Sequence, residues 1–235
     1  MSNSPLVTYT NLTSHRTSPR NHAIDTITIH CVVGQVTAKQ CCDYFVTTDR
    51  QASSNYVVGK DGSIGLSVNE SDRAWTSSNA ANDHRALTIE TASDTTAPYA
   101  VTESAYNALI ELCTDICRRN GKSRMLWIED KNKALAYTPA ADEMRMTVHR
   151  WFAATACPGD YLYAHMGDIS EKVNKKLEDD NMTYYKNLED VPSYYQTAVK
   201  KAVDKGALKG GDNGLNVSED LCRTLTILDR LGKLD

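Results

Sequence analysis

The sequence lacks any long apolar run. None of its hydrophobic stretches approaches the roughly 20 residues that a membrane-spanning helix needs. The opening segment, MSNSPLVTYTNLTSHR, has no apolar stretch of the kind that marks a secretory signal peptide. We therefore expect synthesis in the cytoplasm, with no signal peptide and no membrane partner.

The sequence also has no excess of basic residues, because 26 Lys and Arg stand against 30 Asp and Glu and give a formal net charge of -4. Nucleic-acid binding usually needs concentrated positive charge, so nucleic acid is not an expected partner. Six prolines and twelve glycines are too few for a fibrous or low-complexity chain. The seven cysteines are odd in number, and without an export signal they predict free thiols rather than disulfides.

Hydrophobic periodicity predicts an α/β catalytic domain over residues 1–168, with a central mixed β-sheet flanked by helices. Period-two segments predict strands, and an Asp-Gly pair in SSNYVVGKDGSIGLSV predicts a hairpin turn. Period-3.6 segments predict helices, including one in TAKQCCDYFVTTD with Cys41, Tyr44 and Phe45 facing inward. In TESAYNALIELCTDICRRNGK the same spacing places Cys113 and Cys117 in the core.

The rest of the chain predicts a smaller module. We expect residues 169–183 to form a helical linker and residues 184–235 to form a small all-α C-terminal module. SYYQTAVKKAVDKG and SEDLCRTLTILDRLG have helical spacing, with Gly206 ending the first helix and Ser218 capping the second. About 50 residues can bury little surface alone, so the module is expected to dock or to pair.

Three predicted strands share one pattern of polar residues. The segments Thr28-Ile29-His30, Thr88-Ile89-Glu90 and Thr147-Val148-His149 each place an apolar residue on one face. A Thr, and two residues later a His or Glu, fall on the other face, because side chains alternate along a strand. If the strands are neighbours, two imidazoles and a carboxylate lie over a floor of threonines, which is typical of a functional site.

Cys157, in the turn sequence Cys157-Pro158-Gly159, is a candidate partner for the two histidines. Zinc binds imidazole and thiolate ligands, and catalytic sites leave one position open for water. His30, His149 and Cys157 would supply three ligands. The spacing does not decide between this metal site, a structural or surface His149, and a nucleophilic pair of Cys157 with His149.

Four sequence blocks, in order, resemble the type 2 zinc-dependent N-acetylmuramoyl-L-alanine amidases, which include phage amidase lysozymes and peptidoglycan-recognition proteins. The blocks are ITIHCVV, SSNYVVGKDGSIG, RAWTSSNAANDHRALTIE and VHRWFAATACPGDYL, within residues 20–165. The resemblance implies a mixed sheet flanked by helices, with Zn²⁺ held in a groove by His30, His149 and Cys157. It implies as substrate the amide between N-acetylmuramic acid and L-alanine in bacterial peptidoglycan.

The resemblance also indicates catalytic residues. Many relatives have a catalytic Tyr where this chain has Ser54, whereas others use a Glu in the strand that matches ALTIE, which is Glu90 here. We expect Glu90 to act as general base on a zinc-activated water, and Thr155 to donate a hydrogen bond to the oxyanion. A surface or salt-bridged Glu90 is the alternative.

Four residues are candidates for substrate binding: Trp75, Asn82, His84 and Ser54. Trp75 would form a wall for sugar or peptide, although such an aromatic residue packs internally about as often. Asn82 and His84 are expected in the loop before Glu90, where solvated positions are equally plausible. Cys31 follows His30 and is expected to face the core.

Residues 184–235 resemble, more weakly, a single S-layer-homology-type helical repeat, a class that binds cell-wall polymers. Eight Lys and Arg balance eight Asp and Glu in this stretch, so recognition in a pocket is expected rather than general charge attraction. A hairpin that stabilises the chain or joins copies into a homo-oligomer is the alternative.

Taken together, the sequence predicts a phage endolysin that waits in the host cytoplasm and acts at the bacterial cell wall. Two alternatives belong to other classes. One is a non-catalytic peptidoglycan receptor of the same fold, and the other is a thiol hydrolase that uses Cys157 and His149. Binding-only relatives commonly lack the cysteine ligand, which disfavours the receptor.

Overall fold

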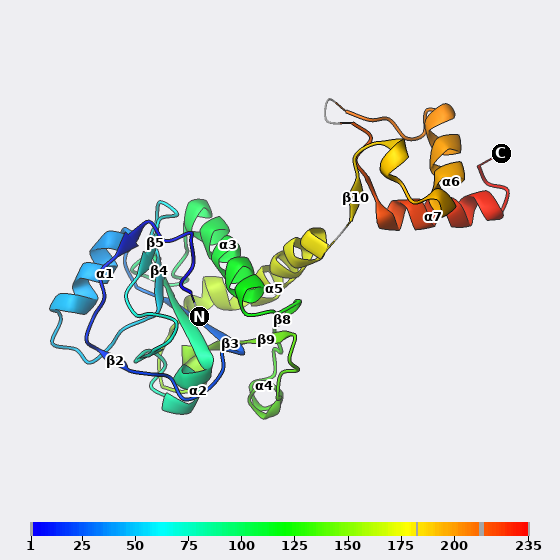
Figure 1. Cartoon of the computed structure of the whole chain (residues 1–235). Coiled ribbons are helices and arrows are strands. Elements are labelled where there is room, and N and C mark those ends of the chain that lie inside the picture. Colours follow the sequence, from blue (N-terminus) through cyan, green and yellow to red (C-terminus); the bar gives the residue numbers. More distant parts are fainter. Residues whose placement is uncertain (1, 182, 212–213, 235) are drawn as a thin grey trace. The chain divides into compact units, whose positions relative to one another are not determined.

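The computed structural model describes residues 2–181, 183–211 and 214–234. The chain forms two compact units, Met1–Leu177 and Glu178–Asp235 (Figure 1). Among the described residues, no helix is both long and apolar enough to cross a membrane. All seven cysteines are free, as was expected of most of them, and all seven are buried.

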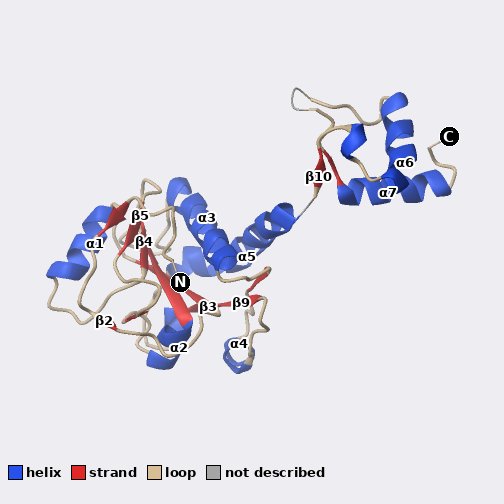
Figure 2. Ribbon diagram, in the orientation of Figure 1, coloured by secondary structure: helices blue, strands red, loops and turns tan. Residues whose placement is uncertain are grey.

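The first unit is built on a seven-stranded sheet in the order β1-β5-β4-β7-β3-β9-β8 (Figure 2). Neighbouring strands are parallel except β4 and β5, which form the predicted antiparallel hairpin. The mixed sheet is therefore confirmed. Its strands are β1 (Tyr9–Thr10), β3 (Thr26–Cys31), β4 (Tyr56–Val58), β5 (Ile64–Leu66), β7 (Ala86–Thr91), β8 (Arg124–Leu126) and β9 (Glu143–Val148), beside a separate pair of β2 (Arg16–Thr17) and β6 (Arg73–Ala74).

Helices cover the sheet on both faces. The helices of the first unit are α1 (Ala38–Thr47), α2 (Ala80–Arg85), α3 (Glu103–Arg119), α4 (Lys131–Ala136) and α5 (Gly159–Asn181), with a 3-10 turn η1 (His149–Trp151). The apolar faces of α3 and α5 pack on Ile27, Ile29, Leu87 and Ile89, the alternate residues of the central strands. Helix α1 packs around Val57, whose register partner is Glu90, so α1 lies on the face that carries the polar residues.

Local signals explain where these helices begin. Thr37 starts α1 with a capping box, and the Thr102 side chain accepts a hydrogen bond from the backbone of Ala105 at the start of α3. Cys113 and Cys117 lie fully buried in the core, as predicted. Tyr44 was expected inward but is 46% exposed, because the apolar face of α1 is narrower than its sequence suggests.

The first unit extends beyond residue 168, where the sequence places its end. Ile169, Val173 and Leu177 continue the apolar stripe of α5 and are buried in the same core as the sheet. The segment expected as a linker therefore packs as part of the first unit as far as Leu177.

The second unit has a core of its own, which includes Tyr195, Val199, Val217 and Cys222. Its helices are α6 (Ser193–Asp204) and α7 (Glu219–Arg230), with a 3-10 turn η2 (Leu188–Asp190). The module is not all-α, because β10 (Tyr184–Tyr185) pairs antiparallel with β11 (Val217–Ser218). Val217 and Ser218 are extended directly before α7, and they form the strand that pairs with β10.

Candidate metal centre

The three strands with the shared polar pattern are neighbours, in the order β7-β3-β9. Thr28 of β3 aligns with Thr88 on one side and with Thr147 on the other, and His30 aligns with Glu90. The hydroxyl oxygens of Thr28 and Thr147 lie 2.8 Å apart. The threonine floor predicted beneath the histidines and the carboxylate is therefore present.

Cys157 is brought over this floor by the segment after β9. Its Sγ lies 3.4 Å from Nδ1 of His30 and accepts a hydrogen bond from the backbone N–H of Cys31, also at 3.4 Å. The rings of His30 and His149 lie 4.9 Å apart, measured between their centroids. One ligand atom from each of His30, His149 and Cys157 lies within 4.8 Å of the others. These residues form the candidate metal centre.

Burial keeps both imidazoles neutral, which is the form that binds a metal. It lowers the pKa of His30 well below the ordinary value, and the neighbouring His149 lowers it further. The pKa of the half-buried His149 is also lowered by burial. Nε2 of His30 is buried without a hydrogen-bond partner.

The thiol of Cys157 is protonated in the absence of a cation. Its hydrogen bond with the Cys31 thiol and its burial both raise the pKa of Cys157. A metal ion would therefore displace a proton when the thiolate binds it. Two imidazole nitrogens and one thiolate, with no fourth protein ligand among the described residues, fit a catalytic zinc site that keeps one position open.

Glu90 lies beside this cluster without a strong partner. Its Oε1 is 4.0 Å from Nδ1 of His30, and its Oε2 is buried with no hydrogen bond. Burial raises the pKa of Glu90 to about 8, and the Cys31 thiol adds to the shift. Because His30 is neutral and the side chain is only 16% exposed, neither the surface position nor the salt bridge considered as alternatives describes Glu90.

Thr155 is exposed two residues before Cys157. Its Oγ1 accepts a hydrogen bond from the backbone N–H of Cys157 at 3.2 Å. An oxygen that accepts in this way still has its own O–H to donate. Thr155 also lines the same cavity as Cys157.

The cluster opens into a groove. A cavity of about 550 Å³ is lined by Glu90, His149 and Cys157, together with Tyr44 of α1 and Trp75. A second cavity of about 590 Å³ shares His149 and Trp75 with it. Both volumes are typical of small-molecule sites. Trp75 forms a wall of both cavities, as expected of a substrate contact, while its Nε1 donates to Thr17 at 2.9 Å.

The sequence missed some of the residues that line this groove. Tyr44 was expected in the core, and Tyr99, which has a positive φ of 60°, was not considered. An amphipathic pattern does not distinguish a groove wall from a core contact, because both require apolar side chains on one helix face. Cys31 packs in the core as predicted, but it also lines the cavity next to Cys157.

Three of the predicted substrate contacts lie elsewhere. Ser54 is fully buried, and its hydroxyl donates to the carbonyl oxygen of Tyr56 at 2.7 Å. Asn82 and His84 lie not in a loop but on α2, because the Asn79 side chain caps a short helix there. His84 accepts a hydrogen bond from the backbone N–H of Asn21 at 3.0 Å and lines neither groove cavity.

Asn82 supports the centre from below. Its side-chain amide donates to the hydroxyl of Thr28 at 2.9 Å, and its carbonyl oxygen accepts from the hydroxyl of Thr147 at 3.0 Å. Thr28 precedes His30 by two residues on β3, and Thr147 near the end of β9 precedes His149, the first residue of η1, by two residues. Asn82 therefore joins α2 to the strand that carries His30 and to the strand that leads directly into His149.

Comparisons with known proteins give one family. Residues 20–160 match the family model described as N-acetylmuramoyl-L-alanine amidase. No curated protein matches the chain.

Several solved structures share the fold. The N-acetylmuramoyl-L-alanine amidase LysC from Clostridium intestinale URNW is 17% identical, with 73% of this chain and 99% of that chain covered and a TM-score of 0.52. A selenomethionine derivative of AmpD is 16% identical, with 72% and 98% covered and a TM-score of 0.51. The endolysin amidase LysCS, also from Clostridium intestinale URNW, is 16% identical, with 76% and 99% covered and a TM-score of 0.50.

Proposed function

The chain belongs to the N-acetylmuramoyl-L-alanine amidase family, and we propose that it is a zinc-dependent endolysin whose metal ligands are His30, His149 and Cys157. As a member of this family it acts on peptidoglycan, at the amide between N-acetylmuramic acid and L-alanine. The observation that carries the proposal is the convergence of two neutral imidazoles and a thiol beside a buried carboxylate in one groove. Every residue of this cluster lies within the matched segment.

Zinc, when bound here, would polarise the scissile carbonyl and lower the pKa of a water at the open position to about 7. The protein's own part begins with positioning. The hydrogen bonds of Asn82 to Thr28 and Thr147 hold strands β3 and β9 in the register that brings His30 and His149 together.

Glu90 is the proposed general base and acid. Its unpartnered Oε2 has no competing hydrogen bond to break before it accepts a proton from the attacking water. The same carboxyl group then gives the proton to the leaving amine nitrogen of L-alanine. A carboxyl group whose pKa lies near neutrality can do both.

Thr155 is the proposed oxyanion donor, because its hydroxyl is free to donate toward the cavity while its oxygen accepts from Cys157. Trp75 is the proposed wall for sugar or peptide in the groove. Of the other expected substrate contacts, Asn82 acts on the strands beneath the site, and the positions of Ser54 and His84 support no direct contact.

We assign the C-terminal module to the recognition of a cell-wall polymer. Its separate core and its balanced charge support a small domain that binds through a pocket. An endolysin of this kind would be held in the host cytoplasm and reach the wall at lysis. Pairing of copies through this module is the competing role.

Digestion of purified peptidoglycan tests the activity. The amidase creates new N-terminal alanine without new reducing sugar ends. New reducing ends, or cuts between amino acids, would contradict the proposed bond.

A chelator separates the amidase from the two competing classes. A zinc amidase stops when its metal is removed and recovers when Zn²⁺ is restored. A thiol hydrolase using Cys157 and His149 keeps cutting in chelator, and a receptor cuts nothing under either condition.

A further inference from the structure

The turn before α2 brings Ser78 against His149 of the candidate metal centre. The hydroxyl oxygen of Ser78 lies 3.5 Å from Nε2 of His149. Both residues line the groove cavity of about 590 Å³, and Ser78 itself is exposed. None of the roles assigned so far uses Ser78, although its side chain contacts a proposed metal ligand.

Ser78 has a backbone conformation that favours glycine. Its φ is 61°, in the left-handed region, where the Cβ atom of any other residue is crowded by the backbone. A glycine would adopt this conformation without that strain. Residues strained in this way are concentrated at functional sites, where the side chain has a task. At Ser78 the strained position is the one that presents a hydroxyl to an imidazole.

Asp83 holds the turn in this shape from the side of the core. Its carboxylate accepts hydrogen bonds from the backbone N–H of Thr76 at 3.1 Å and from the backbone N–H of Ser77 at 3.1 and 3.2 Å. The hydroxyl of Ser77 donates to the same carboxylate at 2.5 Å. Asp83 is 2% exposed and Ser77 is fully buried, so the two residues before Ser78 are fixed in place.

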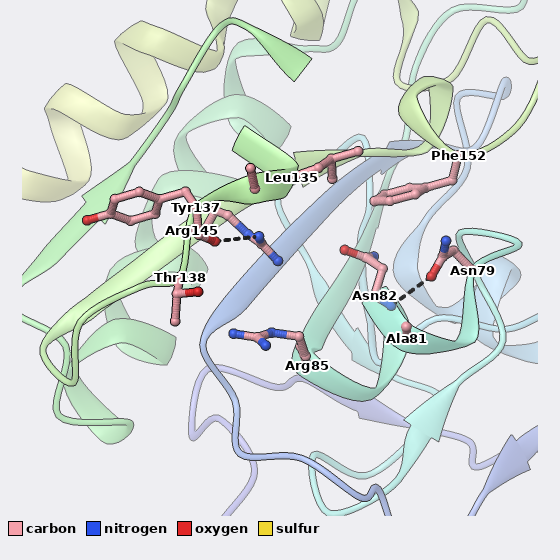
Figure 3. A pocket seen from close by; sticks show the side chains of 10 residues that line it. Asn79, Ala81, Asn82, Arg85, Leu135, Tyr137, Thr138, Arg145 and Phe152 are labelled. Carbon is pink, nitrogen blue, oxygen red and sulfur yellow. Dashed lines mark hydrogen bonds between the residues drawn. The ribbon is translucent and has the colours of Figure 1, made fainter. Parts of the chain in front are cut away.

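Asn79 fixes the turn on its other side. Its side-chain oxygen accepts a hydrogen bond from the backbone N–H of Asn82 at 2.9 Å, the contact drawn between these residues in Figure 3. Its carbonyl oxygen accepts from the backbone N–H of Asp83 at 2.9 Å. Ser78 therefore stands between two neighbours that are both tied to α2, and the turn determines where its hydroxyl lies.

A partner at one ring nitrogen of a histidine determines which nitrogen is left for a metal ion. A neutral imidazole carries its proton on one nitrogen and a lone pair on the other, and the lone pair binds the ion. In metal sites the protonated nitrogen almost always donates to an oxygen of the protein or of water. Because Ser78 stands at Nε2 of His149, the nitrogen left for the ion is Nδ1.

His30 has the same orientation relative to the cluster. Its Nδ1 lies 3.4 Å from Sγ of Cys157, whereas its Nε2 points away from the thiol and is buried without a partner. Both imidazoles would then offer Nδ1 to the ion. Only the half-buried His149 has a side-chain partner at its other nitrogen among the described residues.

We propose that Ser78 is a positioning residue of the metal centre, whose hydroxyl accepts a hydrogen bond from Nε2–H of His149 and so presents the Nδ1 lone pair to the zinc ion. The proposal rests on the proposed zinc-dependent function, and it adds a residue that acts through one of the ligands. It also accounts for a serine at a backbone position that suits glycine.

Two substitutions at Ser78 separate the hydroxyl from the backbone strain. Ser78→Gly removes both, so the urea midpoint of the metal-free protein should stay the same or rise. Ser78→Ala removes only the hydroxyl and keeps the crowded Cβ, so it should give no such gain. Both variants should bind zinc about tenfold more weakly, measured by competition with a chelator of known affinity. A purely structural serine predicts instead that zinc affinity follows stability.

Nitrogen-15 chemical shifts of the His149 ring in the metal-free protein provide a readout that does not depend on zinc. We expect the Nε2–H form in the unchanged protein and a larger share of the Nδ1–H form in Ser78→Ala. A ring that carries its proton on Nδ1 in the unchanged protein would overturn the proposed hydrogen bond.

The outcomes also separate this proposal from the proposed function. If the unchanged protein binds no zinc, the zinc-dependent function fails. If it binds about one zinc per chain and both variants bind zinc equally tightly, the zinc site stands and the role of Ser78 is wrong. Weaker binding in Ser78→Gly alone would assign the loss to the flexible backbone of glycine and would likewise overturn the role of the hydroxyl.

Discussion

At the residue scale, the site depends on a carboxyl group that the fold leaves without a partner. Among the described residues, Glu90 carries the one buried carboxylate oxygen that has no hydrogen bond. Leaving such an atom unsatisfied costs free energy, and that cost is tolerated where the group has a chemical task. The same environment that destabilises its charged form makes Glu90 a stronger base.

Replacement of Glu90 separates catalysis from metal binding. Glu90→Gln keeps the size of the side chain and leaves His30, His149 and Cys157 in place, so bound zinc should stay near one per chain. Peptidoglycan hydrolysis should fall by about 10² to 10⁴-fold, because proton transfer is lost. Metal analysis and turbidity loss of cell walls measure the two effects.

Glu129→Gln is the matched control, because Glu129 is exposed and outside the groove. It should keep both zinc and activity. Loss of zinc in Glu90→Gln would instead make Glu90 part of the metal site.

The raised pKa of Glu90 gives the metal-free protein a characteristic pH dependence. Folding moves this pKa from its ordinary 4.5 to about 8, so between these values the folded state holds a proton that the unfolded state has released. Stability must then fall as pH rises. The lowered pKa values of His30 and His149 act in the opposite direction up to about pH 7.5, one unit above the ordinary histidine value of 6.5, where the unfolded imidazoles have lost nearly all their protons.

Between pH 6.5 and 8 Glu90 should therefore lower the free energy of unfolding of the metal-free protein by about 1.5 kcal/mol, against a smaller rise from the two histidines. Urea unfolding at both pH values measures the drop, and Glu90→Gln should remove it. An identical pH slope in the two proteins would show that the Glu90 carboxyl group is not shifted by burial.

At the element scale, α2 is a small helix with a large effect on the site. It is six residues long, capped by Asn79, and its Asn82 joins the threonines of β3 and β9. Arg85 of the same helix lines a separate pocket of about 320 Å³ together with Arg145 of β9. One short element thus supports the candidate metal centre and lines this separate pocket.

Asn82→Ala should lower the free energy of unfolding by about 1 to 3 kcal/mol, because the buried hydroxyls of Thr28 and Thr147 each lose a hydrogen bond and keep only the one between them. It should also weaken zinc binding by about 10 to 100-fold, since the strands that carry the two histidines lose their shared support. Urea unfolding and competition with a chelator of known affinity measure these effects. Asn132→Ala on the exposed surface of α4 is the control, and equal losses in both variants would contradict the positioning role.

The arrangement of the strands around the site could largely be predicted from the sequence. The repeated Thr-x-His and Thr-x-Glu pattern predicted that β7, β3 and β9 would gather His30, Glu90 and His149, because alternation along a strand fixes which residues share a face. Helix α2 was missed, because AANDHR is short and polar and has no apolar period. The hydrogen bond by which the Asn79 side chain caps this helix forms only in the folded chain.

The sequence predicts part of the lining of the separate pocket that contains Arg145 and Arg85. Arg145 alternates with Thr147 and His149 in EMRMTVH, which places a guanidinium on the face of the site. Sequence alone does not reveal that this arginine is buried or that α2 brings Arg85 toward it. Both facts depend on contacts between segments distant in the chain.

At the scale of the whole molecule, the chain is two units with separate cores. The proposed catalytic residues and the groove all belong to Met1–Leu177. Each unit buries its own apolar residues, so the hydrolytic and the proposed wall-binding activities are expected to separate when the chain is divided.

A chain truncated after Leu177 should fold and should cut soluble muropeptides at close to the full-length rate. Its sedimentation with intact cell walls should fall at least severalfold, since the proposed binding module is gone. Pelleting assays and hydrolysis assays on the same preparations measure both properties. Equal loss of both would favour a stabilising role for the module, and a change from dimer to monomer in analytical ultracentrifugation would favour pairing.

The central claim is that His30, His149 and Cys157 together hold a zinc ion in this enzyme. X-ray absorption at the zinc edge of the metal-loaded protein tests it most directly. We predict one sulfur neighbour at about 2.3 Å and nitrogen or oxygen neighbours at about 2.0 to 2.1 Å, with the sulfur signal absent in Cys157→Ser. A spectrum without sulfur in the unchanged protein, or with the same sulfur signal in Cys157→Ser, would contradict the assignment.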